Sequence, residues 1–267
     1  MYARLKCVYL SMWGIYMQDL ERQNNILKYL EKHRSATVEF LSKTFYASPS
    51  TIRRDLTTLE NTGMVHRTHG GVIYDDKIKE LSIYIRKNKN EDIKNRLAEE
   101  AIKHIPGFTT IYVDNSTTCL PLMKLLQLDK KVVVTNSVLN GTEAQNNYQL
   151  KLIFVGGEFD VSHMSTSGPE ANEFLANFHF DIMFQSCAFI NKDGAYENEY
   201  STAAHKKTAR SLADFKVLIF DRSKLEHSAG CKCANLSDFD LIVCDITEEE
   251  KATLLEKNPN LNIVTIK

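Results

Sequence analysis

Six short apolar runs in the second half of the chain limit its fold most strictly. They are TTIYVD (109–114), KVVVTN (131–136), LKLIFVGG (150–157), FDIMFQS (180–186), FKVLIFD (215–221) and DLIVCD (240–245). Nearly continuous apolar runs are typical of parallel strands that are buried on both faces. Helical patterns follow several of them, notably over 117–128 and 203–214. A further helix, carrying Ile93, Leu97, Ala101 and Ile105, precedes the first. This alternation predicts an α/β domain with a mainly parallel sheet over 91–267.

The first part of the chain has helical spacing instead. Ile26, Leu27 and Leu30 mark one helix, and a second begins at Thr37, an N-cap residue, and buries Val38, Leu41 and Phe45. A third has Ser48 as its N-cap, Pro49 in its first turn, a stripe of Ile52, Leu56 and Leu59, and Gly63 just past its end. Two short strands, MVHR and VIYD, flank THGG. Three helices and a hairpin predict an α+β winged helix-turn-helix over 18–75.

The polar face of the third helix suits DNA. Arginine makes bidentate bonds to guanine in the major groove, and hydroxyl groups reach bases or phosphates. The wing then contacts the DNA backbone or the minor groove, with the Gly70-Gly71 pair allowing close approach. We therefore expect a DNA-binding surface made of Thr37, Ser48, Ser50, Thr51, Arg53, Arg54, Thr57, Arg67 and His69. The alternative is a solvated face in which Arg53 and Arg54 pair with Asp55 and Glu60.

Polar and glycine-rich residues follow three of the predicted parallel strands, and ligands of open α/β sheets bind beyond the carboxyl ends of strands. Hydroxyl groups and free N–H groups at a helix start suit an anion. Lysines supply positive charge for a phosphate, and aspartates bond to sugar hydroxyls. Each feature also has a plain structural explanation, as a helix cap or a solvated lysine. The predicted effector site comprises Asp114, Ser116, Thr117, Thr118, Thr135, Asn136, Gly156, Gly157, Gly168, Lys206, Asp221 and Lys224.

The composition narrows the class of protein. The chain has 267 residues, 43% of them hydrophobic, and a formal net charge of −1, so any nucleic-acid surface must be local. Its six cysteines are scattered, and Cys231 and Cys233 form the only close pair, without further ligands at zinc spacing. We expect reduced thiols, no metal and no cofactor. Residues 1–17 are too short an apolar run for a membrane span and form a possible extension. These features predict a cytoplasmic protein without a membrane partner, and the charged stretch 76–90 predicts a linker.

The segment LSKTFYASPSTIRRDLTTLENTGMVHRTHGG (41–71) resembles the helix-turn-helix of the DeoR family of transcriptional regulators. That family has Ser-x-x-Thr-Ile-Arg-Arg-Asp-Leu in its recognition helix, followed by Gly and then Arg-x-His-Gly-Gly. In the second half, VDNSTT, VVVTNS, VGGEF, TSGPEA and DRSK are similar to the family's sensor domain. Arg86 and EDIKNRLAEEA resemble its linker region. The family's Glu-Ala-Glu-Val-Lys is replaced by Thr202-Ala203-Ala204-His205-Lys206, which removes two acidic positions.

The resemblance implies a fold related to ribose-5-phosphate isomerase and a phosphorylated sugar as effector. It implies a regulator, in particular a repressor of a sugar-metabolism operon, that binds double-stranded operator DNA. One short recognition helix makes too few specific contacts, so a homo-oligomer, dimer or tetramer, is expected. Two alternatives remain. A sugar-phosphate isomerase would use Asp114, Asp221 or Glu199 as general base, and a metal or redox sensor would use Cys231 and Cys233.

Overall fold

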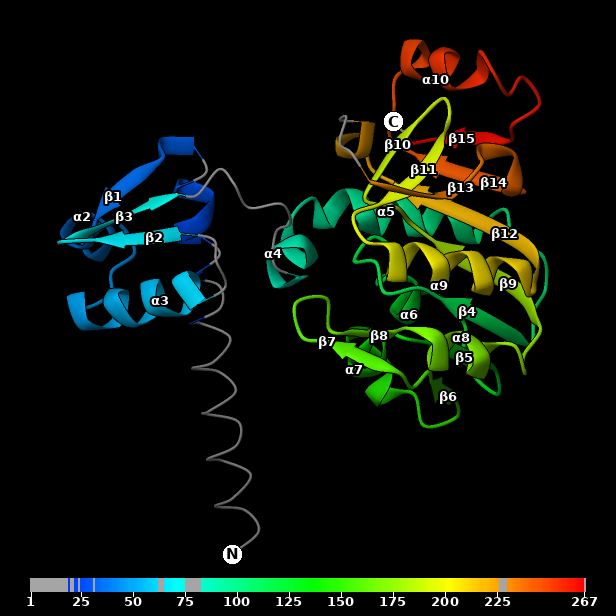
Figure 1. Ribbon diagram of the computed structural model, residues 1–267, viewed down its shortest axis with the longest axis horizontal. Coiled ribbons are helices and arrows are strands. Elements are labelled where there is room, and N and C mark those ends of the chain that lie inside the picture. Colours follow the sequence, from blue (N-terminus) through cyan, green and yellow to red (C-terminus); the bar gives the residue numbers. More distant parts are fainter. Residues whose placement is uncertain are drawn as a thin grey trace, which may run out of the picture. The chain divides into compact units, whose positions relative to one another are not determined.

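The computed structural model describes residues 19, 22, 23, 25–30, 32–61, 65–74, 83–225 and 230–266. The chain divides into two compact units, residues 1–85 and 86–267 (Figure 1). The division falls within the stretch 76–90 that was predicted to be a linker. The possible extension 1–17, Gly63 and residues 76–82 of the linker lie outside the described residues. Among the described residues, no helix has the length and apolar content needed to cross a membrane.

The first unit is a winged helix-turn-helix. Residues 25–30 are helical, and the elements that follow are β1 (Ser35–Thr37), α2 (Val38–Thr44), α3 (Pro49–Asn61), β2 (Val65–Thr68) and β3 (Gly71–Tyr74). Its core holds the predicted apolar stripes, with Ile26, Leu30, Leu41, Ile52 and Leu56 fully buried. The two predicted hairpin strands are joined by β1, which the sequence did not indicate, in the antiparallel order β1-β3-β2.

The second unit is built on a seven-stranded sheet in which every neighbouring pair is parallel. The strand order is β15-β14-β12-β9-β4-β5-β6. Six of these strands match the six apolar runs, namely β4 (Thr110–Val113), β5 (Val132–Thr135), β6 (Lys151–Phe154), β9 (Phe180–Gln185), β12 (Ala213–Phe220) and β14 (Leu241–Cys244). The edge strand β15 (Ile263–Thr265) was not predicted. The predicted α/β fold class is therefore confirmed.

Helices cover both faces of this sheet (Figure 1). On one face, α5 (Glu91–Ile102) and α6 (Leu122–Leu125) pack on Ile111, Val133 and Phe184. The other face carries α8 (Pro169–Leu175), α9 (Tyr200–Ser211) and α10 (Glu248–Leu255). The remaining helical segments are α4 (Ile83–Asn88), α7 (Val138–Glu143) and the short 3-10 turns η1 (Ala144–Asn146), η2 (Arg222–Leu225) and η3 (Leu236–Asp238).

Two small antiparallel sheets complete the second unit. One pairs β7 (Glu158–Asp160) with β8 (Ser165–Ser167), and the other has the order β10-β11-β13. Its strands are β10 (Phe189–Asn191), β11 (Gly194–Glu197) and β13 (Cys231–Ala234). The Cys231-Lys232-Cys233 stretch is thus a strand, and none of the described residues form a His, Cys, Asp and Glu group suited to a metal ion.

The predicted helix over 117–128 is wrong for most of its length. Residues 117–121 form turns, and only α6, with four residues, is helical. Cys119 N donates to the Ser116 carbonyl and Leu122 N to the Cys119 carbonyl, which is the spacing of 3-10 turns. Pro121 lacks an N–H and cannot continue an α-helical ladder. The expected helix-dipole contribution to an anion site at Thr117 is therefore lost.

Candidate DNA-binding surface and effector site

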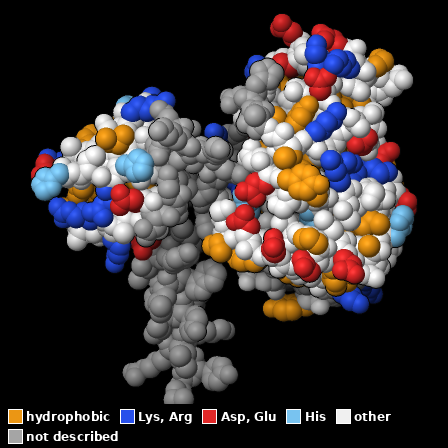
Figure 2. Space-filling view, in the orientation of Figure 1, with side chains coloured by type: hydrophobic (Ala, Val, Ile, Leu, Met, Phe, Trp, Pro, Cys, Tyr) orange, Lys and Arg blue, Asp and Glu red, His pale blue; other side chains and the backbone are white. Residues whose placement is uncertain are grey.

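The polar side of α3 lies on the surface. Arg53, Arg54 and Thr57 are exposed, whereas Ile52 and Leu56 are fully buried. Lys and Arg side chains project from the α3 side of this unit (Figure 2). Of the predicted DNA-binding residues, Thr51 is partly exposed and the others are exposed. The exposed ones are Thr37, Ser48, Ser50, Arg53, Arg54, Thr57, Arg67 and His69.

Local hydrogen bonds hold the starts of α2 and α3. The Thr37 hydroxyl accepts from Phe40 N at 3.1 Å, and the Ser48 hydroxyl accepts from Thr51 N at 3.1 Å. Both residues are therefore N-caps, as predicted. The Ser48 hydroxyl also lies 2.8 Å from that of Ser50, so the cap gathers exposed hydroxyl groups at the helix start.

The acidic residues beside the two arginines have other partners. Asp55 is 1% exposed and accepts hydrogen bonds from Arg22 Nε at 2.6 Å and Gln23 Nε2 at 3.0 Å. Glu60 accepts from the Arg67 backbone N–H at 2.9 Å. Since Asp55 and Glu60 are used to join α3 to the first helix and the wing, the alternative of a self-paired face is not observed.

The wing is attached to α3 by side chains. Arg67 Nη1 donates to the Thr57 hydroxyl at 2.9 Å, which links β2 to the recognition helix. Gly70 has a φ of 90°, and a Cβ there would meet no heavy atom within 4 Å. At Gly71 a Cβ would lie 2.7 Å from the Ala36 carbonyl oxygen. Gly71 is therefore required by the β1–β3 pairing, and its close approach to DNA stays a prediction.

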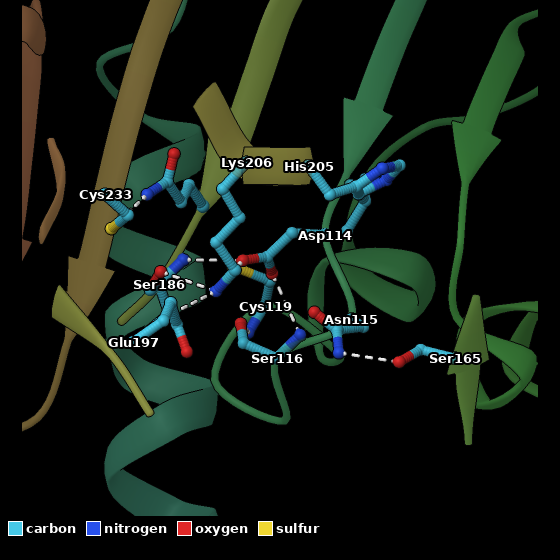
Figure 3. A network of polar contacts seen from close by, with 12 residues as sticks. Asp114, Asn115, Ser116, Cys119, Ser165, Ser186, Glu197, His205, Lys206 and Cys233 are labelled. Atoms are coloured by element: carbon cyan, nitrogen blue, oxygen red, sulfur yellow. Dashed lines mark hydrogen bonds and ion pairs between the residues drawn. The ribbon is translucent and has the colours of Figure 1, made fainter. Parts of the chain in front are cut away.

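In the second unit, two predicted effector residues contact each other. Lys206, from α9, lies 2.9 Å from Asp114 Oδ2, just after β4, and 2.6 Å from Glu197 Oε1, at the end of β11 (Figure 3). Its Nζ also donates to the Ser186 carbonyl at 2.9 Å. Three acceptors thus surround one ammonium group, and the side chains of Lys206 and Asp114 are 4% and 1% exposed.

The charges of this cluster stabilise one another. Burial alone would raise the pKa of Asp114, but Lys206 and the N–H groups of Ser116 and Ser186 outweigh it and lower that pKa. Burial would lower the pKa of Lys206, yet Asp114 and Glu197 raise it well above its ordinary value. The cluster therefore holds one positive and two negative charges, so Lys206 has no surplus charge for a phosphate.

A second buried lysine lies at the start of this unit. Lys94 of α5 is 4% exposed, and its Nζ donates to the Thr117 hydroxyl at 3.1 Å and to the Arg86 carbonyl. Burial lowers its pKa to about 8; Lys224 and Arg86 lower it too, while Asp221 opposes them. Lys94 thus contacts Thr117 and interacts electrostatically with Lys224 and Asp221.

The Asp221 side chain is held by a residue of its own loop and by Asn90, which precedes α5. It is 2% exposed, and its Oδ1 accepts from Asn90 Nδ2 at 3.2 Å and from the Ser223 hydroxyl at 2.5 Å. Lys224 N donates to the Asp221 carbonyl at 2.9 Å. This loop follows β12, at the same sheet edge as Asp114.

Residues after β5 are used inside the protein. The Thr135 hydroxyl donates to the Val113 carbonyl at 2.7 Å. Asn136 Nδ2 donates to the Thr166 carbonyl, and its Oδ1 accepts from the Tyr112 hydroxyl at 3.0 Å. Both ends of the Asn136 amide are therefore satisfied within the fold.

The Tyr112 hydroxyl also lies 2.9 Å from His205 Nε2, and His205 Nδ1 is 2.9 Å from the Asn172 side chain. Burial and the charge of Lys206 lower the pKa of His205 to about 4. A neutral histidine thus completes a buried polar chain.

The other predicted residues lie around the same sheet edge. Gly156 and Gly157, after β6, are exposed, and a Cβ at Gly157 would lie 2.5 Å from the Ser167 carbonyl oxygen. Ser116 is partly exposed and Thr118 is buried. Gly168 caps α8 with a φ of 99°.

Sequence reasoning missed Lys94, Glu197, Ser186 and His205. Lys94 could have been found, because it lies three residues before Leu97 on the apolar stripe of its helix, where a lysine is unusual. Glu197 lies on β11 and reaches the site only through an unpredicted sheet. Glu199, the third candidate base, is exposed at the start of α9.

Comparisons with known proteins agree with this architecture. Residues 22–78 match the DeoR-like helix-turn-helix domain, and residues 89–246 match the DeoR C-terminal sensor domain. The L-fucose operon activator of Haemophilus influenzae is 30% identical over 227 residues, covering 84% of this chain and 91% of that protein. The glycerol-3-phosphate regulon repressor of Escherichia coli is 25% identical over 231 residues, covering 86% and 92%.

Among solved structures, a D-ribose-5-phosphate isomerase in complex with phospho-erythronic acid is similar, with a TM-score of 0.37, 15% identity and coverage of 50% of this chain and 53% of that one. The sequence matches extend over both units, from the recognition helix to the strands that carry Asp114 and Asp221. The chain belongs to the DeoR family of DNA-binding transcriptional regulators.

Proposed function

We propose that this chain represses a sugar-metabolism operon and that a phosphorylated sugar, bound at the carboxyl edge of the sensor sheet, controls its affinity for operator DNA. The family has a DNA-binding head and a sensor domain. Two relatives are named for an L-fucose operon and a glycerol-3-phosphate regulon, which supports a small phosphorylated polyol or sugar.

The observation that carries the proposal is the buried Lys94, whose Nζ donates to the Thr117 hydroxyl at 3.1 Å and which is affected by two further cations. Lys224 and Arg86 lower the pKa of Lys94 by charge repulsion, and Asp221 and Glu91 oppose them. A buried ammonium group whose pKa is lowered gains most from an incoming anion, because the anion restores the solvation that burial removed. We assign the phosphate to Thr117, Lys94 and Lys224.

The sugar hydroxyls belong at the neighbouring acidic cluster. Asp114 and Glu197 supply carboxylate oxygens, which accept hydrogen bonds from hydroxyl groups. Lys206 orients these carboxylates, which replaces the phosphate-binding role expected of it. Ser116, Asp221 and the backbone at Gly156 and Gly157 complete our assignment. Thr118, Thr135, Asn136 and Gly168 shape the site from within.

We further propose that the chain binds its operator as a homo-oligomer. A winged helix has one recognition helix, and two of them on a symmetric operator double the specific contacts. Light scattering on the purified chain at operator-binding concentration tests this directly; a monomer bound to a single half-site would contradict it.

The effector proposal is tested by anisotropy titration of DNA from upstream of the chain's own gene, at fixed salt. A panel of sugar phosphates is compared with the matching free sugars. One phosphorylated compound should lower operator affinity about 100-fold, equivalent to about 2.7 kcal/mol. A compound that instead raises affinity would contradict release of the operator by the effector while keeping the site.

The matched variants are Lys224→Met and Lys103→Met. Lys224 lies in the proposed phosphate site, whereas Lys103 lies on the exposed end of α5 in an ion pair with Glu100. Lys224→Met should weaken the effector response at least tenfold without affecting DNA binding. An equal response in both variants would place the phosphate elsewhere.

A further inference from the structure

Tyr46 combines a rare backbone conformation with an exposed aromatic ring. It lies in the turn between α2 and α3, its φ is 49°, and it is 97% exposed. Left-handed backbone is disfavoured for bulky residues, because Cβ crowds the carbonyl oxygen, and glycine or asparagine adopts it more readily. The backbone conformation of Tyr46 therefore destabilises the fold, and its side chain buries almost no surface in compensation.

The neighbouring residues hold this turn without help from the Tyr46 ring. Phe45 N donates to the Leu41 carbonyl at 2.9 Å and Ala47 N to the Ser42 carbonyl at 3.2 Å. The Ser42 hydroxyl donates to the Ala47 carbonyl at 2.6 Å. A strained residue that its surroundings hold in place, with its side chain directed into solvent, is typical of a functional position.

The position of Tyr46 indicates the function. It precedes the Ser48 cap by two residues and so lies just before the start of α3, where the exposed hydroxyl groups of Ser48 and Ser50 gather. Phenol groups donate hydrogen bonds to phosphate oxygens, and such contacts set the register of a recognition helix on the duplex. We propose that Tyr46 contacts the operator backbone beside the start of α3, a residue role that neither the DNA-binding prediction nor the effector site includes.

The test compares operator affinity and thermal stability for Tyr46→Phe and Tyr46→Asn in the full chain. Tyr46→Asn should raise the melting temperature of the winged-helix unit, because asparagine tolerates left-handed backbone, and should weaken operator binding about tenfold. Tyr46→Phe retains the ring and loses the hydroxyl group, so binding should weaken with stability unchanged. Tyr148→Phe, at a tyrosine that is 94% exposed in the sensor unit, is the control and should leave affinity unchanged.

Loss of affinity in Tyr46→Asn with unchanged affinity in Tyr46→Phe overturns the proposed contact of the hydroxyl group with phosphate. Unchanged affinity in both Tyr46 variants overturns the proposal. Phenylalanine and tyrosine have the same backbone preference. The operator affinity of Tyr46→Phe therefore tests the hydroxyl contact even where Tyr46→Asn changes the turn.

A second observation concerns the start of the sensor unit. The Arg86 backbone carbonyl accepts hydrogen bonds from Lys94 Nζ and from the Thr117 hydroxyl, the latter at 3.2 Å. Next to it, Lys87 Nζ lies 2.7 Å from Glu143 Oε1. These bonds fasten the end of α4, a helix within the predicted linker 76–90, to the sensor sheet.

Lys94 and Thr117 are also the groups to which we assign the effector phosphate, so this inference rests on the proposed function. We infer that the phosphate and the Arg86 carbonyl compete for the same two side chains. Effector binding then frees the end of α4 from the sensor sheet. Whether the effector is bound therefore determines whether the end of α4 is held by Lys94 and Thr117.

Tryptic cleavage after Arg86 and Lys87 in the intact chain, followed by mass spectrometry without any effector, tests the fastening alone. Lys94→Met and Thr117→Val remove its donors and should accelerate cleavage about tenfold, with Lys103→Met as the control. Unchanged cleavage in both variants overturns this inference and leaves the effector site standing. Accelerated cleavage in a chain that no sugar phosphate affects would keep the fastening and reject the proposed effector.

Discussion

Lys206 Nζ lies 2.9 Å from Asp114 Oδ2, and this ion pair joins α9 to the end of the central strand β4 in the interior of the sensor unit. Glu197 shares the ammonium group at 2.6 Å. Buried ion pairs add little net stability over apolar packing, but removing one partner is costly because the remaining charge is left uncompensated. The cluster therefore makes the sensor unit sensitive to changes at this one lysine.

Lys206→Met should lower the free energy of unfolding of the sensor unit by about 3–5 kcal/mol. Two carboxylates lose their shared counter-charge in this variant. The adjacent Lys207 is exposed, so Lys207→Met is a matched control and should cost little. Urea unfolding followed by circular dichroism measures both; equal stability of the two variants would show that the cluster is not coupled to folding.

His205 predicts a pH dependence of stability. Its pKa is lowered from 6.5 to about 4 in the folded chain, so the unfolded chain binds more protons between these values. The stabilising contribution is complete above pH 6.5 and is lost as the pH falls to about 4. At about 1.4 kcal/mol per pKa unit, the loss reaches about 3 kcal/mol.

His205→Gln removes the titrating imidazole. The free energy of unfolding of this variant should therefore fall less steeply than that of the unchanged chain as the pH is lowered from 6.5 to about 4. His179→Gln, at an exposed histidine paired with Asp214, controls for histidine content. Parallel curves for His205→Gln and the unchanged chain would contradict the buried neutral imidazole.

Arg53→Ala and Arg54→Ala should each weaken operator binding 10- to 100-fold, which corresponds to the roughly 1–3 kcal/mol of a bidentate base contact. Both side chains are exposed, so the melting temperature should not change. Lys43→Ala, an exposed lysine on α2, serves as the control. Unaltered operator affinity in both arginine variants would remove α3 as the recognition helix.

Asp55→Ala should destabilise the winged-helix unit by about 3 kcal/mol, because Arg22 loses a buried partner. DNA binding should fall only in proportion to the unfolded fraction and recover at lower temperature. Glu39→Ala, on the exposed side of α2, is the comparison. A selective loss of affinity in a fully folded Asp55→Ala chain would mean that Asp55 acts at the DNA instead.

The fold was largely predictable because periodicity and burial agree along the chain. The stripes through Ile26, Leu41 and Ile52 are buried, and every long apolar run became a parallel strand. The prediction of a helix over 117–128 was wrong because Ser116, Thr117 and Pro121 favour turns, which the spacing of apolar residues does not reveal. The short strands β10, β11 and β13 depend on tertiary pairing, which a local pattern does not encode.

The candidate site was predictable only in part. Strand-end residues such as Asp114 and Asp221 follow from the rule that ligands bind at the carboxyl edge. The pairing of Lys206 with Asp114 and Glu197 could not be inferred, since residues on α9, β4 and β11 meet only in the folded chain. Thr135 and Asn136 have the composition of ligand-binding residues and instead bond within the protein.

The most direct measurement of the central claim is operator affinity across the sugar-phosphate panel for the unchanged chain and for Lys224→Met. The account predicts that one phosphorylated sugar weakens operator binding of the unchanged chain about 100-fold, that its free sugar has no effect, and that Lys224→Met retains operator binding with a response at least tenfold weaker. Operator binding that no phosphorylated compound alters, or an equally strong response in Lys224→Met, would contradict it.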